Sequence, residues 1–238
     1  MSENIFNSEF LLAGTNKVVR NRSVLAALTN KQSNDDGSLT EEEVKWLERR
    51  AQDGFGIITT AAAFVHLNGK SWNGELGVHS DEMLPGLTDL ASRINSHGAI
   101  SLVQIFHGGM RAPTEITGRT PISSSRNRTK QSSTNFSRAM PETQIREAIQ
   151  WYVDAAIRCH KAGFDGVEIH GAHGYLITQF LGKKTNRRLD EWGGTLRNRS
   201  RFLIEIVRRI REATPRDFVV AVRILSLIHI SEPTRRAL

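Results

Sequence analysis

The sequence lacks the features that would assign it to a secreted, disulfide-stabilised or membrane-spanning class. It holds one cysteine, Cys159, among 238 residues, which excludes an internal disulfide and an all-cysteine metal cluster within the chain. No apolar run approaches the ~20 residues that a membrane-spanning helix needs. The N-terminus, MSENIFNSEF, has neither the basic start nor the apolar core of a secretory signal. These absences predict a cytoplasmic protein with no membrane partner.

Positive charge is the main compositional excess. The chain has 32 Lys and Arg against 25 Asp and Glu, a formal net charge of +7. Between residues 111 and 138, five arginines and one lysine are opposed by Glu115 alone. That segment is rich in Ser, Thr and Asn, which is typical of a solvated loop and not of a nucleic-acid-binding face. We therefore expect no nucleic-acid partner.

Short apolar runs alternate with amphipathic segments along the chain. The runs predict strands at residues 18–27, 57–64, 99–106 and 218–224, with another that ends at His170. The intervening segments predict helices, the first of which begins with a capping box formed by Thr40 and Glu43. Cys159 falls on the inward face of the third helix, which predicts a core residue and not a nucleophile.

This alternation predicts a parallel α/β fold. No Gly-rich phosphate loop follows the first strand, which argues against a dinucleotide-binding sheet. A (β/α)8 TIM barrel fits better, although about five of its eight strand-helix units are present. We expect residues 1–224 to form this incomplete barrel. Residues 225–238, LSLIHISEPTRRAL, continue no helix or strand pattern, and we expect them to be a foreign tail, such as translated linker sequence.

The side chains that carry chemistry in a parallel barrel lie at the C-terminal ends of its strands. Here those ends carry Thr29, Gln104, His170 and Arg223, and His173 and Tyr175 follow the fourth strand closely. The set combines an amide, two imidazoles, a phenol, a hydroxyl and a guanidinium. It predicts a site for a flat ligand that is rich in hydrogen-bond acceptors.

Three other interpretations stay open for these residues. Glu168, His170 and His173 could bind a metal ion, but no further ligand is apparent, and we expect no metal. Gln104 could be a buried amide that ties neighbouring strands together. Arg223 could pair with Glu168 inside the barrel.

Two adjoining segments resemble a known family. The run GVEIHGAHGYLITQFL, followed by RRLDEWGGTLRNRSRF, resembles the old yellow enzyme family of flavin-dependent ene-reductases. The segments NRSVLAALTN, GIITTAAA, LVQIFHGG and VVAVRI resemble that family's first, second, third and fifth barrel strands. The resemblance implies a (β/α)8 barrel that binds FMN at its mouth and uses NADH or NADPH as reductant.

The resemblance also implies roles for individual residues. The flavin would be bound by Ala26, Ala27, Leu28, Thr29, Ala61, Gln104 and Arg223. Thr29 would lie near the flavin C4 carbonyl, Gln104 at the pyrimidine part of the ring, and Arg223 at the N1/C2 edge, where negative charge collects on reduction. Ala61 would offer a backbone contact.

The substrate implied by the resemblance is an activated alkene of the α,β-unsaturated carbonyl type. His170 and His173 would hold its carbonyl or nitro oxygen, flavin N5 would deliver hydride to its β-carbon, and Tyr175 would donate a proton to its α-carbon. The full-length protein could form a homo-oligomer. The alternative is a truncated, non-catalytic fragment that cannot retain FMN.

Overall fold

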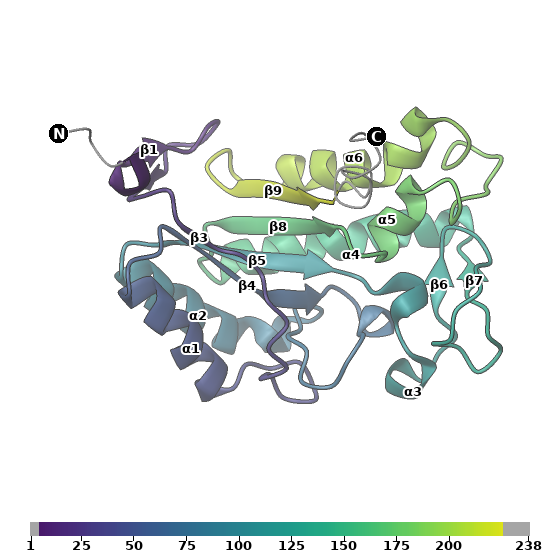
Figure 1. The fold of residues 1–238 in the computed structure, drawn as a ribbon, viewed down its shortest axis with the longest axis horizontal. Helices are drawn as coiled ribbons and strands as arrows, with labels where there is room; N and C mark the ends of the chain where they lie inside the picture. The colour runs from purple at the N-terminus through teal and green to yellow at the C-terminus, as the bar shows by residue number, and fades with distance from the viewer. Residues whose placement is uncertain (1–4, 226–238) are drawn as a thin grey trace, which may run out of the picture.

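A five-stranded parallel sheet forms the centre of the computed structural model, which describes residues 5–225. The strands lie in the order β3 (Val24–Leu25), β4 (Ile57–Phe64), β5 (Ile100–Phe106), β8 (Gly166–Gly171) and β9 (Val219–Ile224). All point the same way, toward the right in Figure 1. The sheet belongs to an incomplete (β/α)8 barrel, as predicted. Residues 226–238, nearly all of the expected foreign tail, lie outside the described residues.

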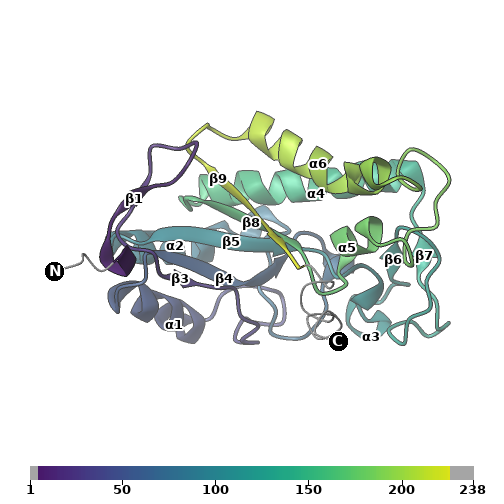
Figure 2. The same ribbon diagram turned by 45° about the horizontal axis from the view of Figure 1, so that its top comes forward.

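Four long helices cover one face of this sheet, in the pairs α1/α2 and α4/α6 (Figures 1 and 2). They are α1 (Glu41–Gln52), α2 (Leu84–Ser96), α4 (Glu142–Lys161) and α6 (Leu196–Ala213). Shorter elements fill the connections: η1 (Ile5–Asn7), η2 (Leu67–Gly69), η3 (Asp81–Met83), η4 (Gly109–Arg111), α3 (Thr114–Thr117) and α5 (Leu176–Leu181). Two small sheets pair β1 (Phe10–Leu11) with β2 (Val18–Val19) and β6 (Ile122–Ser123) with β7 (Arg138–Ala139). Within residues 5–225, no helix is both long and apolar enough to cross a membrane.

Alternation along each strand separates two cores. Val103 and Ile105 of β5 lie in the large core between the sheet and the helices, whereas Leu102 lies in a smaller core on the opposite face. Cys159 is fully buried in the large core, as predicted. Burial raises the pKa of its thiol to about 12, so the sulfur stays protonated and unreactive.

Residues 18–27 were predicted as one strand, and this prediction is wrong. The structure breaks the segment into β2, antiparallel to β1, and β3, parallel to β4. Arg20 causes the break, because its guanidinium donates to the carbonyl oxygens of Ala51, Phe55 and His97. Those bonds hold Arg20 against the C-terminal ends of α1 and α2, so residues 18–27 do not continue as one strand along the sheet.

The capping box at α1 is half formed. The Thr40 hydroxyl accepts from the Glu43 N–H at 3.2 Å, as predicted. The Glu43 carboxylate does not return to Thr40. It is fully buried and accepts from Asn30 Nδ2 at 2.9 Å and from Ser33 Oγ at 2.5 Å. Glu43 therefore ties the loop after β3 to the first turn of α1, and burial raises its pKa.

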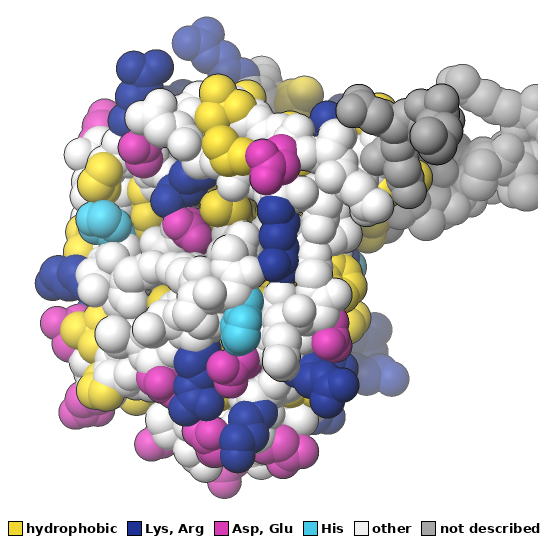
Figure 3. Space-filling view, turned by 90° about the vertical axis from the view of Figure 1, so that its left-hand side faces the viewer, with side chains coloured by type: hydrophobic (Ala, Val, Ile, Leu, Met, Phe, Trp, Pro, Cys, Tyr) yellow, Lys and Arg dark blue, Asp and Glu magenta, His cyan; other side chains and the backbone are white. Residues whose placement is uncertain are grey.

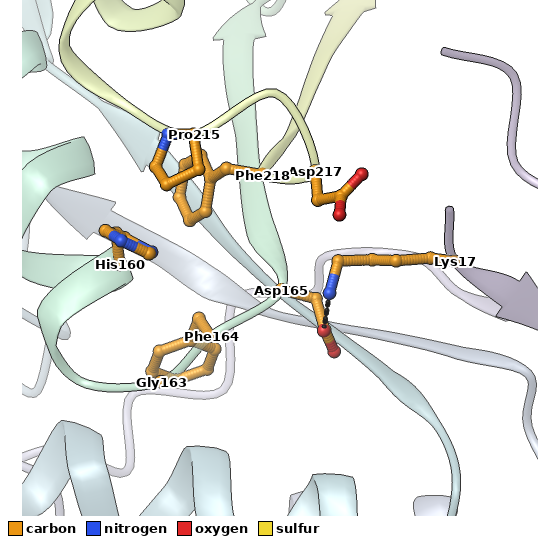
Figure 4. A pocket seen from close by; sticks show the side chains of 8 residues that line it. All are labelled: Lys17, His160, Gly163, Phe164, Asp165, Pro215, Asp217 and Phe218. Atoms are coloured by element: carbon orange, nitrogen blue, oxygen red, sulfur yellow. Dashed lines mark hydrogen bonds and ion pairs between the residues drawn. The ribbon is translucent and has the colours of Figure 1, made fainter. Parts of the chain in front are cut away.

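The N-terminal end of the sheet carries an ion pair between Lys17 and Asp165 and several hydrogen bonds to acidic side chains (Figure 4). Lys17 Nζ lies 2.5 Å from Asp165 Oδ1, and Asp217 Oδ1 accepts from the Asn16 N–H at 3.0 Å. The second Asp165 oxygen accepts from the Ser101 N–H at 2.9 Å. These contacts fix the β1–β2 hairpin beside a cavity of about 210 Å³. Figure 3 shows acidic and basic side chains interspersed over this end of the molecule, so it presents no single-sign patch.

Candidate active site

A cavity of about 50 Å³ lies at the C-terminal ends of all five strands of the sheet. It is lined by Ala27, Thr29, Ala62, Trp72, Gln104, His170, His173, Tyr175 and Arg223. Seven of the ten residues predicted for the site are in this set. Ala26, Leu28 and Ala61 are not, and Leu28 is exposed.

Strand register explains how residues far apart in sequence meet here. Gln104 of β5 is paired with Glu168 of β8, and His170 of β8 is paired with Arg223 of β9. Because alternate residues point to the same face of a strand, these side chains share the inner face of the sheet. Neighbouring strands thus bring the amide, the imidazole and the guanidinium into one cavity.

A register shift in β4 determines which alanine lines the cavity. Simple alternation from Ile57 would direct Ala61 to the inner face. The pairing of β4 with β5 shifts between Thr59 and Ala62, so Ala62 lies opposite Gln104. Ala62 packs with Phe64 and Phe106 on the inner face. The Ala61 carbonyl accepts from the Thr60 hydroxyl at 2.8 Å, and the predicted contact of Ala61 with the cofactor stays a prediction.

His170 is a buried polar group of the site. Its side chain is 3% exposed, and its Nε2 lies 3.2 Å from Nδ1 of His173. Its own Nδ1 is buried and has no hydrogen-bond partner among the described residues. Burial, reinforced by the charges of His173 and Arg223, lowers the pKa of His170 to about 3. The imidazole is therefore neutral at physiological pH.

His173 lies in the turn that follows β8, with a left-handed backbone (φ 57°). This conformation is uncommon for a residue with a Cβ. The Arg111 guanidinium donates to the His173 carbonyl and also lies 4.9 Å from the centre of the Tyr175 ring. Arg111 had no assigned role from the sequence, and the structure shows that it holds this turn against Tyr175.

Tyr175 is half-buried within a group of aromatic rings. Its ring packs edge-on against Phe106, with centroids 4.9 Å apart, and against His170 at 5.1 Å. Burial raises the pKa of the phenol, and the nearby Arg111 charge partly opposes that effect. Tyr175 therefore carries its proton at neutral pH.

The open interpretations of Gln104 and Arg223 have different outcomes. Gln104 Nε2 donates to Glu168 Oε1 at 2.5 Å, so this amide does tie β5 to β8. No ion pair joins Arg223 to Glu168 in the described part of the chain. The Arg223 guanidinium makes instead one long contact, 3.4 Å, to the Ala27 carbonyl. Residues 5–225 hold no group of three or more His, Cys, Asp or Glu that could bind a metal ion.

Sequence reasoning missed Trp72 and Ala62. Trp72 belongs to the loop after β4, eight residues beyond the end of that strand, and no sequence pattern marks it as a site residue. His107, also near a strand end, is no site residue. It is fully buried, accepts from the Gly109 N–H through Nδ1, and contacts Asn68 Oδ1 through Nε2 at 2.6 Å.

The fold and the cavity together define the class of protein. A parallel sheet of barrel type, with polar side chains from five strands meeting at its C-terminal end, is typical of (β/α)8-barrel enzymes. The sequence matches the NADH:flavin oxidoreductase / NADH oxidase family over residues 12–234. The chain belongs to this family of FMN-dependent oxidoreductases, in which NADH or NADPH is the reductant.

Individual relatives agree with this assignment. The chain is 37% identical over 195 residues to a probable NADH-dependent flavin oxidoreductase of Bacillus subtilis, covering 82% of this chain and 52% of the relative. It is 37% identical over 214 residues to an NADPH dehydrogenase of Halalkalibacterium halodurans, covering 89% and 60%. The old yellow enzyme homologue of Zymomonas mobilis superposes with a TM-score of 0.85 at 28% identity, covering 92% and 62%. The chain thus spans little more than half the length of these proteins.

Proposed function

We propose that this chain forms the substrate-binding part of an FMN-dependent enzyme that reduces activated C=C bonds with NADH or NADPH. The observation that carries the proposal is the cluster of His170, His173 and Tyr175 in one cavity with Gln104 and Arg223. FMN, when bound, would supply the hydride chemistry between the nicotinamide and the substrate. Small-molecule alkenes of the α,β-unsaturated carbonyl type are the proposed substrates.

The available hydrogen-bond donors support FMN as the ligand. The guanidinium of Arg223 makes one long contact within the described residues, so most of its N–H groups are free to bind the pyrimidine edge of the ring. Thr29 adds a hydroxyl to the same cavity. A fixed cation at the edge where negative charge collects favours the reduced ring. Of the predicted cofactor-binding residues, Ala27, Thr29, Gln104 and Arg223 are the ones we propose to touch FMN directly.

His170 and His173 are proposed to bind the substrate oxygen. The unpartnered Nδ1 of His170 is a buried polar atom, and such an atom costs free energy until a ligand satisfies it. Because the imidazole is neutral, it can donate one N–H without carrying a charge. A ligand oxygen that opens the contact between His170 Nε2 and His173 Nδ1 can accept one N–H from each neutral ring. Two such donors on a carbonyl or nitro oxygen withdraw electrons from the conjugated double bond, so the β-carbon becomes electrophilic.

Tyr175 is proposed to donate the proton to the α-carbon. Its phenol is protonated at neutral pH and lies beside the His170 ring, next to the group that would hold the substrate oxygen. The α-carbon becomes strongly basic once the β-carbon has gained hydride, so even a weak acid can protonate it. The Arg111 guanidinium over the ring would stabilise the phenolate that remains.

Phenol binding tests the assignment of the histidines. Phenol should bind the FMN-loaded chain, and replacing both histidines (His170→Ala with His173→Ala) should weaken it about tenfold or more, because two donors are lost. The flavin absorbance should stay with the protein. His160→Ala, which removes an exposed histidine at the N-terminal end of the sheet, is the matched control. Unchanged phenol affinity in the double variant would contradict the proposed roles.

A second candidate is a non-catalytic chain that cannot retain FMN. Within residues 5–225, the outer edges of β3 and β9 have no partner strand, and this favours the second candidate, since an open edge is prone to association. Leu28 beside the cavity is 58% exposed. Size-exclusion chromatography with absorbance at flavin wavelengths separates the two candidates. A yellow protein that elutes as a defined species supports the enzyme, whereas a colourless aggregate supports the fragment.

A further inference from the structure

Glu75 is a buried carboxyl group to which the proposed mechanism gives no role. It lies in the loop that links β4 to α2, and its side chain is 1% exposed. One oxygen, Oε2, accepts from the backbone N–H of Ser71 at 2.6 Å and from that of Trp72 at 3.4 Å. The other, Oε1, is buried without a hydrogen-bond partner among the described residues. A carboxyl group in such surroundings is costly, so the turn that it anchors is a candidate for a functional role.

The turn anchored by Glu75 carries one wall of the active site. Trp72 lines the cavity and stacks against Phe106, with ring centroids 5.5 Å apart. Phe106 in turn packs edge-on against Tyr175 at 4.9 Å. A continuous series of contacts therefore runs from the Glu75 carboxyl, through the Trp72 backbone and indole and the Phe106 ring, to the phenol.

The other side of this turn has no room to move. A Cβ added at Gly108, the second residue after β5, would come within 2.1 Å of the Ser71 hydroxyl. The Gly108 N–H also donates to the Gly69 carbonyl at 2.9 Å. The turn is thus held between Glu75 and the end of β5. Loss of the Glu75 contacts would leave Trp72 as the part that is free to shift into the cavity.

We propose that Glu75 is a positioning residue of the active site, which acts through Trp72 and Phe106 to hold the Tyr175 ring beside His170. The inference rests on the function proposed above for Tyr175. It adds that the acid donor owes its position to a carboxyl group that touches neither substrate nor cofactor.

The charges around Tyr175 provide an independent readout. Arg111 lies over its ring, His170 and His173 flank it, Arg223 lines the same cavity, and a Glu75 carboxylate raises the pKa of the phenol. Burial raises the pKa of Glu75 well above its usual value, opposed by the two backbone N–H groups and by Lys70. Because a charged Glu75 raises the pKa of Tyr175, removing that charge lowers it.

The tyrosinate titration can be assigned because the chain has two tyrosines. Tyr152 is fully buried, and burial raises its pKa far above that of Tyr175. Ultraviolet difference absorbance of the folded chain therefore reports Tyr175 first as the pH rises. Glu75→Gln keeps an oxygen for the two backbone N–H groups and removes the charge, and its Tyr175 should titrate at lower pH than in the unmodified chain. An unmoved titration would overturn the proposal.

Phenol affinity of the FMN-loaded chain tests the positioning itself. Glu75→Ala should weaken phenol binding about tenfold, and Glu75→Gln should restore it to within about twofold, because the amide oxygen keeps the turn in place. Glu43→Gln, at another fully buried carboxyl, is the control and should leave the Tyr175 titration unchanged. Wild-type affinity in Glu75→Ala, or no rescue by Glu75→Gln, would contradict the role. If the unmodified chain binds no phenol, the proposed function fails, and the titration, which needs no flavin, still decides the inference.

Discussion

The two ends of the central sheet use polar side chains in opposite ways. At the N-terminal end, Asp165 accepts from Lys17 and Ser101, and the Arg20 guanidinium donates to three carbonyl oxygens. At the C-terminal end, His170 has an unpartnered buried nitrogen and Arg223 makes a single contact of 3.4 Å within residues 5–225. Both ends are rich in polar groups, but the Asp165 carboxylate and the Arg20 guanidinium at the first end are satisfied by the protein itself.

This difference separates groups that stabilise the fold from groups that are available to a ligand. Satisfied polar groups lower the free energy of the folded chain, whereas an unsatisfied buried group raises it and is kept for another reason. Changes at the N-terminal end should therefore reduce stability and leave binding intact. Changes at the C-terminal end should weaken ligand binding without reducing stability.

The largest effect on stability is expected from Arg20→Ala. The substitution leaves the carbonyls of Ala51, Phe55 and His97 without the donor that now satisfies them, at a cost of about 3 kcal/mol in unfolding free energy. Urea unfolding measures the loss. Arg20→Lys should recover only a small part, because an ammonium group cannot reach three carbonyls with fork geometry. A loss below about 1 kcal/mol would show that these bonds do not hold the N-terminal end together.

Asp165→Ala should have the second largest effect. It removes the ion pair with Lys17 and two hydrogen bonds to Ser101, with an expected loss of about 2 kcal/mol. Asp165→Asn keeps the shape and should lose less. Phenol affinity of the FMN-loaded protein should be unchanged in both variants. A Kd raised more than a few-fold would break the division between the two ends.

At the C-terminal end, His173→Gly should increase stability. The left-handed backbone of His173 (φ 57°) is strained for a residue with a Cβ, so glycine should gain about 0.5–1 kcal/mol in unfolding free energy. Phenol affinity should fall because a proposed donor is removed. Lys31→Gly is the matched control, since Lys31 has a similar φ of 56° and does not line the cavity. It should show a similar gain in stability and no change in affinity.

Sequence patterns were sufficient for the order of strands and helices and for most of the cavity. The strand predicted at residues 57–64 matches β4, and the buried face predicted for α4 packs against the sheet. Periodicity works in these segments because each has one apolar face and one consistent partner. It failed at residues 18–27, where Arg20 redirects the chain through bonds to residues far along the sequence. Contacts of that kind leave no local pattern.

The same limit explains what the sequence missed at the site. Ala62 lines the cavity because the shift in register within β4 reverses the alternation after Thr59. Nothing in a run of three alanines marks where such a shift falls. Trp72 lines the cavity because the buried Glu75 anchors its turn, and the depth of Glu75 depends on the tertiary fold.

The smallest expected effect is the response of phenol binding to pH. An exposed histidine with the ordinary pKa of 6.5 gains a proton between pH 8 and pH 5. His170 does not, because burial, together with the charges of His173 and Arg223, lowers its pKa to about 3. Its donor therefore stays neutral over the whole interval. Burial and the charges of Arg223 and Arg111 lower the pKa of His173 as well. Phenol affinity should therefore change by less than about twofold, since phenol itself, with a pKa of about 10, does not titrate there.

Calorimetric titration of the FMN-loaded protein with phenol at four pH values between 5 and 8 measures this directly. An affinity that rises as the pH falls, with a midpoint near the ordinary histidine value, would mean that an imidazolium donates to the ligand. It would contradict the assignment of His170 as a neutral donor, because burial disfavours the charged form of its ring. A pH-independent affinity would support a neutral His170, whose unpartnered nitrogen is satisfied when a ligand oxygen binds.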